Sequence, residues 1–510
     1  MESKEKSRLL RDGTIHALGL VLSSVAGLLL VPIMVRGLGP EQYGLWIASV
    51  AAVSIFGAFD LGLRLIIIRD IAGDLRPERT PILRLLLWVH IAMGCFAAAV
   101  VATAGTFASG RLHLSESVRL VAPLVFVLGA CSCFFDQVFT YVTSVWAGLR
   151  RFDLMNGYSV GASILRIAAF ATALALGRGL LTIAALHASI SALCAVVGLA
   201  NLFLTSPSLR PRIERVPWSA LREPLGFGAL SQAATSIASL QMPISTLLIS
   251  LINGAAAVTP FTVGQKFPTL VSGLTWRISE VFFPYASRQR GHEAIDADEF
   301  LATISRWLLL LISPAALGLI VLAPALLRTW MGQVDPTALA VLRIAAASVL
   351  VETLIPGAIQ LFWGASQTSV VLFVNIATLF ADVLLACVML SQIGPAGAAW
   401  ATLGSTVIAV ALLMSFASVK GSVQLMPTGL TIFRRVLPSV LFAIVPAYLL
   451  QRSFAFSGWL PIGLTVLASA AIYAVVVWKY TATEEELEFI ARAVRGVRAG
   501  SAPQIEVGKS

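Results

Sequence analysis

Residues 85–106 read LLLWVHIAMGCFAAAVVATAGT and contain no Asp, Glu, Lys or Arg. An α-helix needs ~20 mainly apolar residues to cross the hydrocarbon core of a membrane, and this stretch is long enough. The composition of the whole chain agrees, since 58% of its 510 residues are hydrophobic and only 12% are charged, and its mean hydropathy is +0.87. These values lie far outside the range of soluble globular proteins. The sequence therefore predicts an all-α integral membrane protein.

Further apolar stretches of similar length occur on both sides of this one. Together they predict fourteen transmembrane helices. We place them at residues 14–34, 43–68, 85–106, 120–146, 158–176, 180–204, 225–251, 258–283, 300–327, 338–363, 370–390, 396–419, 434–451 and 460–478. Because fourteen is an even number, both ends of the chain are expected on the same side of the membrane.

Basic residues predict the orientation, because loops rich in Lys and Arg stay on the cytoplasmic side. With the N-terminus inside, the cytoplasmic segments hold the large majority of the 36 Lys and Arg residues. The outer loops contain only Arg36, Arg111, Arg119, Arg178, Arg328 and Arg452. We therefore predict a multi-pass protein of the bacterial inner membrane with both termini in the cytoplasm. This bias also accounts for the net charge of +10 without a nucleic-acid partner.

Sequence signatures of enzymes and ATP-driven pumps are missing. The chain has no Walker A motif, no His-Glu-x-x-His, no Gly-x-Ser-x-Gly and no Cys-x-x-Cys. Its five cysteines all fall inside predicted spans and have neither metal-ligand nor disulfide-framework spacing. The short loops leave no room for a soluble catalytic domain. We therefore predict a transporter and not an enzyme, with no cofactor and no metal site.

The longest early interruption of the apolar pattern lies at residues 205–224, which contain four prolines and four arginines. We interpret it as a cytoplasmic linker between two six-helix lobes, residues 1–204 and 225–419. Since each lobe has an even number of helices, both enter the membrane from the same side, as parallel repeats do, with a substrate path between them. Residues 434–478 supply two additional helices, and residues 479–510 are predicted to form a cytoplasmic amphipathic tail that contacts membrane lipids.

Three short motifs resemble those of bacterial polysaccharide flippases. RGLGPEQYGLW at residues 36–46, followed by DLG at residues 60–62, is similar to the first hairpin of that family. GLRRFD at residues 148–153 resembles its cytoplasmic turn after the fourth span, and GPAGAAWAT at residues 394–402 resembles the start of its twelfth span. The similarity covers roughly residues 1–420. The glycines and proline of the hairpin also suit a tight turn in any membrane protein.

This family is part of the superfamily of multidrug, oligosaccharidyl-lipid and polysaccharide exporters. The resemblance implies a flippase that moves a lipid-linked oligosaccharide, carried on undecaprenyl pyrophosphate, from the inner to the outer leaflet. It implies a role in O-antigen or exopolysaccharide biosynthesis. It also implies polysaccharide polymerase and export machinery as partners.

Ten ionisable residues lie inside predicted spans, where an unpaired charge at the helix centre costs ~2.5–3.5 kcal/mol. The cations are Arg64, Arg166, Lys266, Arg277 and Arg343. The acids are Asp60, Asp136, Glu280, Glu352 and Asp382. Guanidinium groups bind phosphate oxygens through paired hydrogen bonds, so we predict that the cations line a substrate-binding cavity for the anionic pyrophosphate headgroup. The acids are candidates for ion coupling or ion pairing, and structural pairs such as Arg277 with Glu280 are an equal alternative.

Two other functions stay open. The first is a multidrug or metabolite antiporter of the same superfamily, although a carrier of organic cations is expected to present an acidic cavity. The second is a membrane-embedded glycan polymerase or ligase, which usually needs a sizeable outer loop, whereas the longest one here is residues 107–119. Prolines within spans bend helices and would permit two lobes to rock in alternating access. A sodium ion, a proton or the membrane potential is expected to drive transport.

Overall fold

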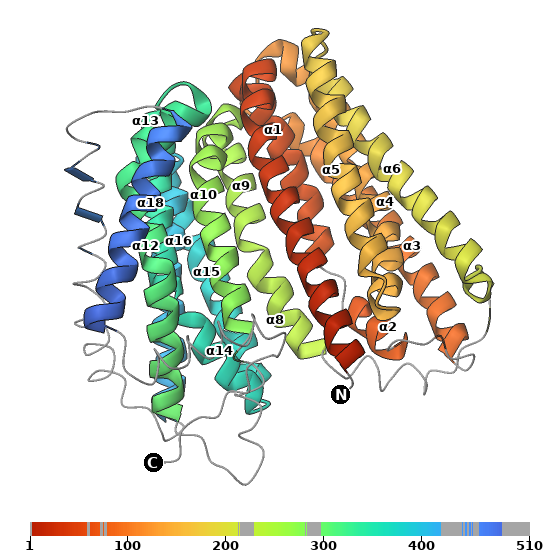
Figure 1. Ribbon diagram of the computed structural model, residues 1–510. Helices are drawn as coiled ribbons and strands as arrows, with labels where there is room; N and C mark the ends of the chain where they lie inside the picture. The colour runs from red at the N-terminus through yellow and green to blue at the C-terminus, as the bar shows by residue number, and fades with distance from the viewer. Residues whose placement is uncertain are drawn as a thin grey trace. The chain divides into compact units, whose positions relative to one another are not determined.

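The structure is a computed structural model of the chain. It describes residues 3–58, 62–71, 75, 79–212, 214, 229–280, 282, 297–419, 441, 444–445, 448–449, 451 and 458–481. For residues 3–23, and for a few residues beside the gaps, only the backbone is described. Every regular element in these ranges is a helix (Figure 1). The all-α prediction is therefore confirmed.

The first two predicted spans lie in one long helix, α1 (Ser3–Ala58), which is interrupted at Gly39. Gly39 has φ 79° and ψ 167°, a conformation that glycine adopts readily and other residues rarely do. The N-terminus and α2 (Leu63–Ile71) lie at the same end of the bundle in Figure 1, so the chain turns back at Gly39. The turn predicted at residues 36–46 is present.

Four further helices of the N-terminal half each match a predicted span. They are α3 (Thr80–Ser109), α4 (Glu116–Gly148), α5 (Phe152–Ala175) and α6 (Leu180–Thr205). The short 3₁₀ helix η2 (Pro207–Leu209) follows α6. The described residues of the predicted linker at residues 205–224 are 205–212 and 214.

The second half continues the helical pattern. Its helices are α8 (Ala229–Ser239), α9 (Gln241–Ile252), α10 (Ala255–Glu280), α12 (Ala297–Met331), α13 (Pro336–Glu352), α14 (Ile355–Gly364), α15 (Thr368–Ile393), α16 (Ala396–Val419) and α18 (Trp459–Val476). The π-helical segment η4 (Val477–Thr481) extends α18. The predicted tail at residues 479–510 lies outside the described residues beyond position 481.

Two predicted spans are broken helices, and a proline explains each break. The span at residues 225–251 is divided between α8, which ends at Ser239, and α9, which contains Pro243. The span at residues 338–363 is divided between α13, which ends at Glu352, and α14, which contains Pro356. A proline ring clashes with the carbonyl group four residues earlier, and this is where both preceding helices end.

Within the described residues, eleven helical segments are long and apolar enough to cross a membrane. Fourteen spans were expected, and each of three differences removes one of them. Helix α1 joins two predicted spans, α10 is not among these eleven segments, and residues 434–451 lie largely outside the described residues. The span predicted at residues 43–68 is likewise divided between α1 and α2. The exact number of crossings and the cytoplasmic position of the termini stay predictions.

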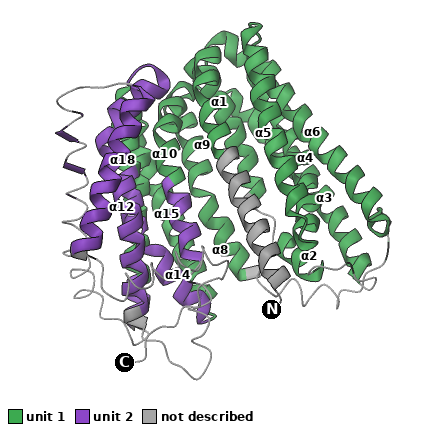
Figure 2. Cartoon of the chain, viewed as in Figure 1, with its two compact units in different colours: residues 1–270, 335–345, 366–413 green, residues 271–334, 346–365, 414–510 purple. Residues whose placement is uncertain are grey.

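The chain divides into two compact units (Figure 2). Unit 1 comprises Met1–Leu270, Asp335–Ala345 and Ser366–Leu413, and unit 2 comprises Val271–Val334, Ala346–Ala365 and Met414–Ser510. The predicted division into lobes at residues 1–204 and 225–419 stays a prediction.

Each unit has its own apolar core. In unit 1, one cluster contains Leu83 of α3 with Tyr141 and Trp146 of α4, and a second cluster joins α9, α10, α15 and α16 around Phe261. In unit 2, side chains of α12 pack against Val349 of α13. These cores hold the helices that carry the polar groups described below.

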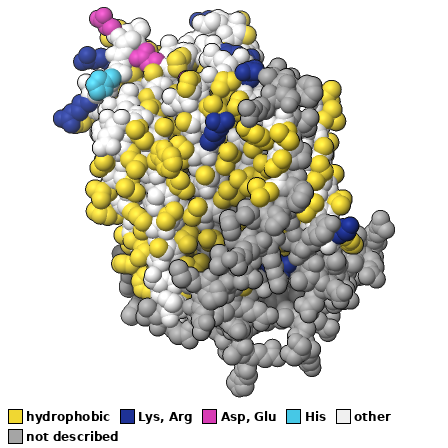
Figure 3. Space-filling view, turned by 90° about the vertical axis from the view of Figure 1, so that its left-hand side faces the viewer, with side chains coloured by type: hydrophobic (Ala, Val, Ile, Leu, Met, Phe, Trp, Pro, Cys, Tyr) yellow, Lys and Arg dark blue, Asp and Glu magenta, His cyan; other side chains and the backbone are white. Residues whose placement is uncertain are grey.

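Large apolar side chains also cover the outside of the helices. Phe96, Leu120, Phe380 and Leu467 are each at least 68% exposed. Figure 3 shows hydrophobic side chains over much of the described part of this face, with most of the charged side chains near its upper edge. Such exposure suits a surface surrounded by lipid. The chain is a multi-pass membrane protein.

The turn at residues 36–46 is held by contacts from two other helices of unit 1. The Thr259 hydroxyl of α10 donates to the Pro40 carbonyl at 2.6 Å. The Glu41 carboxylate accepts hydrogen bonds from the backbone N–H and the hydroxyl of Ser115 at 2.6 and 2.7 Å. This carboxylate lies at the N-terminus of α4, where the helix dipole favours an anion. The turn is therefore a junction between α1, α4 and α10.

Replacing Gly44 with alanine is expected to lower the stability of this junction. A Cβ atom at Gly44 would overlap the Ala255 carbonyl oxygen, whereas one at Gly57 would meet nothing within 4 Å. Overpacking against backbone costs about 1–3 kcal/mol. Thermal unfolding of the purified protein in detergent should therefore show a lower midpoint for Gly44→Ala than for Gly57→Ala. Equal midpoints for the two variants would contradict the close approach.

Candidate functional site

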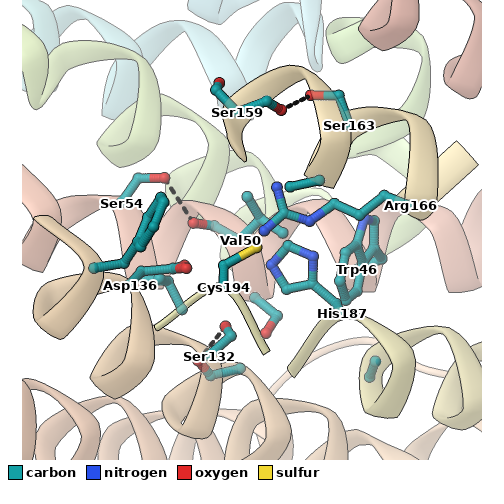
Figure 4. Close-up of a pocket in the computed structure, with 16 residues that line it drawn as sticks. Trp46, Val50, Ser54, Ser132, Asp136, Ser159, Ser163, Arg166, His187 and Cys194 are labelled. Carbon is teal, nitrogen blue, oxygen red and sulfur yellow. Dashed lines mark hydrogen bonds between the residues drawn. The ribbon is translucent and has the colours of Figure 1, made fainter. Parts of the chain in front are cut away.

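A cavity of about 360 Å³ lies within unit 1. Residues of α1, α4, α5 and α6 line it, and Figure 4 shows their side chains. The α1 residues follow the Gly39 turn, so the turn brings this part of α1 against the other helices. The polar lining residues are Ser49, Ser54, Ser132, Asp136, Ser159, Ser163, Arg166 and His187. The cavity therefore brings these polar groups together inside a set of apolar helices.

Two of the residues that line the cavity are charged, Asp136 and Arg166. Arg166 Nη2 donates to the Ser191 hydroxyl at 3.2 Å. The Asp136 carboxylate lies near both Ser191 and the Arg166 guanidinium. Ser191, on a third helix, is therefore a neighbour of both charged side chains. The sum of the two charges leaves the cavity close to neutral.

Two buried nitrogen atoms at the cavity have no hydrogen-bond partner in the described part of the chain, Arg166 Nε and His187 Nδ1. Figure 4 shows the guanidinium and imidazole groups close together in the cavity. The His187 ring also meets Trp46 edge to face, with ring centroids 5.1 Å apart. Buried polar atoms nearly always have a partner, so these nitrogens indicate that water or a ligand completes the site.

A second polar site surrounds Asp382 of α15, whose side chain is fully buried in unit 1. Gln241 Nε2 donates to Oδ1 at 3.0 Å, and the Ser405 hydroxyl donates to the same oxygen at 3.2 Å. The Ser245 hydroxyl donates to Oδ2 at 3.1 Å. None of these three partners is charged. The break before α9 positions the amide of Gln241, the first residue of that helix.

A third polar site lies in unit 2 at Glu352, the last residue of α13. Its Oε1 atom accepts a hydrogen bond from the Ser272 hydroxyl at 2.8 Å and from Trp276 Nε1 at 2.5 Å. A carboxylate is unfavourable at the C-terminal end of a helix because the dipole is negative there. The two donors from α10 offset part of this cost.

The predicted cations occupy different environments. Arg166 lines the cavity, Lys266 is half-buried on α10, and the remaining three are exposed: Arg64 on α2, Arg277 on α10 and Arg343 on α13. Lys266 and Arg343 belong to unit 1, and Arg277 belongs to unit 2. A common cavity for these five residues stays a prediction.

The remaining predicted acids are Glu280 and Asp60. Glu280 is exposed at the end of α10, and the described contacts contain no ion pair between it and Arg277. Asp60 lies outside the described residues. Of the predicted cations and acids, Arg166 and Asp136 line the same cavity, and the described salt bridges do not include a pair between them.

Sequence reasoning missed the uncharged partners of the three buried acids. For two of the acids, these partners include a pair four residues apart, which shares one helix face. The pairs are Gln241 with Ser245 on α9 for Asp382, and Ser272 with Trp276 on α10 for Glu352. The spacing is a usable signal, but it is weak because a serine within a helix often bonds its own backbone.

Residues 9–289, more than half of the chain, match the family model described as polysaccharide biosynthesis protein. No curated protein sequence matches the chain. Several solved structures share its fold. The lipid II flippase MurJ in an inward closed conformation has 12% sequence identity and a TM-score of 0.72, with 91% of this chain and 97% of that chain covered.

Two further transporter structures are similar. An inward-facing multidrug resistance MATE family transporter of the MOP superfamily has 14% identity and a TM-score of 0.59, covering 79% of this chain and 95% of that one. A MOP superfamily transporter from Pyrococcus furiosus has 14% identity and a TM-score of 0.58, covering 81% and 95%. At these identities the similarity concerns the fold. The family match, together with this fold, shows that the chain belongs to the polysaccharide biosynthesis protein family.

Proposed function

We propose that the protein is a flippase that moves an oligosaccharide linked to undecaprenyl pyrophosphate across the bacterial inner membrane by alternating access. The observation that carries the proposal is the match of residues 9–289 to a polysaccharide biosynthesis family, on a fold similar to that of a lipid II flippase. The product would serve synthesis of a surface polysaccharide such as O-antigen or exopolysaccharide. Polysaccharide polymerase and export machinery would then act on the flipped lipid.

The anionic headgroup of this substrate needs cationic groups within the membrane, and the chain provides them. Arg277 is exposed on α10, and no carboxylate of the described residues forms a salt bridge with it. Lys266 lies eleven positions earlier on the same helix, in unit 1. A guanidinium and an ammonium can each contact the oxygens of a pyrophosphate. We therefore assign headgroup binding to Arg277 and Lys266 first.

Arg277→Ala and Lys266→Ala are each expected to slow translocation of the labelled glycan lipid in proteoliposomes by about tenfold or more, because a charged hydrogen bond contributes about 1.5–3 kcal/mol. The assay follows lipid loaded in one leaflet at matched reconstitution. Arg178→Ala is the control, since Arg178 is exposed and lies between α5 and α6. Wild-type rates in both test variants would reject headgroup binding by α10.

Energy coupling is assigned to the buried acids whose contacts with the described residues include no cation. Within the described part of the chain, Asp382 has only neutral donors, whereas Asp136 lies near Arg166. An uncompensated buried carboxylate is costly, so binding of a proton or a metal cation would stabilise the Asp382 site. Asp382 is therefore our first candidate for the coupling ion, and Glu352 is the second.

Asp382→Asn is expected to remove the stimulation of translocation by one particular gradient while leaving slow basal exchange. Sodium, pH and potassium-diffusion gradients are imposed in turn on the proteoliposomes. Glu280→Gln serves as the control, because Glu280 is an exposed acid. A wild-type translocation rate that no gradient changes would reject ion coupling. A normal increase of the rate in Asp382→Asn would move the assignment to Glu352.

The similarity to MATE transporters keeps a multidrug or metabolite antiporter as the second candidate function. The same proteoliposomes distinguish the two, since an antiporter would export a small organic cation and leave the glycan lipid in its leaflet. Lengthening of the glycan chain would instead indicate the membrane-embedded polymerase or ligase.

A further inference from the structure

The cavity in unit 1 offers a different chemistry from a phosphate site. Asp136 would repel an anion that approached Arg166, and Arg166 would repel a cation that approached Asp136. Both charges line the same cavity of about 360 Å³. One of these two side chains therefore repels a charged ligand, whether its net charge is negative or positive. A neutral, strongly polar ligand is the class that suits the cavity.

The lining also provides hydrogen bonds of both kinds. Arg166 Nε is a donor without a partner in the described residues, Asp136 is an acceptor, and His187 Nδ1 acts as either according to its tautomer. Serine hydroxyls from α1, α4 and α5 add groups that donate and accept. A sugar hydroxyl also donates and accepts, so a polyhydroxylated ring can satisfy all these groups together.

The size and the apolar walls agree with a single sugar ring. The volume lies at the lower end of the range of ~300–1,000 Å³ for small-molecule sites. Trp46, Phe139 and Val53 supply apolar lining beside the polar groups. The C–H faces of a pyranose would pack against such side chains, as ligands do in sites with few polar and many apolar contacts.

We infer that this cavity binds one neutral sugar residue, held between Asp136, Arg166 and His187. The inference rests on the proposed function in one respect, since the glycan of the lipid-linked substrate is the natural source of that residue. A free monosaccharide is the other source of the same chemistry.

Cys194 is one of the lining residues, so the rate at which its thiol is modified reports whether a ligand occupies the cavity. A variant that retains only this cysteine carries alanine at Cys95, Cys131, Cys133 and Cys387. The rate at which neutral methyl methanethiosulfonate modifies Cys194 is measured in lipid nanodiscs, with glucose, galactose or N-acetylglucosamine as probes. At least one neutral sugar is expected to slow the reaction saturably, by threefold or more. Glucuronate and glucosamine, the charged counterparts, are expected to leave the rate unchanged.

Ser163→Leu in this background tests the position of the ligand. Ser163 lines the cavity and its hydroxyl bonds the Ser159 carbonyl of its own helix, so leucine fills space without leaving an unpaired partner outside that helix. Thr172→Leu is the matched control, at an exposed position of α5. Sugar protection should disappear in Ser163→Leu and persist in Thr172→Leu. Unaltered thermal midpoints establish that each variant is folded.

Failure of the sugar site and failure of the flippase give different results. No protection by any sugar, equal protection by charged sugars, or a Cys194 that never reacts would each overturn the sugar site, even where glycan lipid is translocated normally. Protection by neutral sugars without translocation of any glycan lipid would support the site and reject the flippase. Protection by lipid-linked glycan at far lower concentration than by free sugar would identify the substrate as the source.

Discussion

A backbone N–H or carbonyl group in hydrocarbon has no water to bond, and each unsatisfied group costs several kcal/mol. This constraint makes every described element of the chain a helix. It also makes any interruption of a helix significant, because the freed backbone groups must find partners inside the protein. The interruptions at Gly39, before Gln241 and after Glu352 are therefore the places where the structure departs from simple spans. Each of them adjoins or positions polar groups that enter one of the sites.

The three buried acids show three ways to keep a carboxylate in such a protein. Asp136 lies near a cation, Arg166, and near Ser191, which accepts a hydrogen bond from that cation. Asp382 has neutral donors from two other helices and is fully buried. Glu352 has two donors on one oxygen at a helix end. A carboxylate with its own cation is already compensated, so an exchangeable ion has most to contribute at the other two.

The sequence predicts the spans well because an apolar run long enough to cross lipid has no other stable position in a membrane protein. The breaks were harder to predict. Pro243 and Pro356 each lie four residues after the last residue of the preceding helix, as expected for a proline that ends a helix. Pro123 in α4 and Pro314 in α12, however, lie inside continuous helices. Membrane helices tolerate proline when neighbours satisfy the freed carbonyl, and a single sequence does not show those neighbours.

Some residues of the candidate sites can be singled out from the sequence, and others cannot, for a related reason. Charged residues such as Asp136, Arg166 and Asp382 stand out in an apolar span because burial of a charge is costly. Neutral partners such as Ser191 and Gln241 do not, since serine and glutamine cost far less to bury and often bond locally. Which acid has a cation and which has neutral donors therefore depends on packing between helices.

Residues of the three motifs that resemble the flippase family make structural contacts in this chain. In the first, Glu41 bonds Ser115 and Gly44 admits the Ala255 carbonyl. In the second, Gly148 packs closely on Ile71, and in the third a Cβ atom at Gly397 would lie 2.5 Å from backbone atoms of Met389. None of these glycines lines the cavity in unit 1. The resemblance thus reflects the scaffold, and selection among glycans is expected to reside in the hydroxyl, carboxylate and guanidinium groups that the scaffold arranges around the cavity.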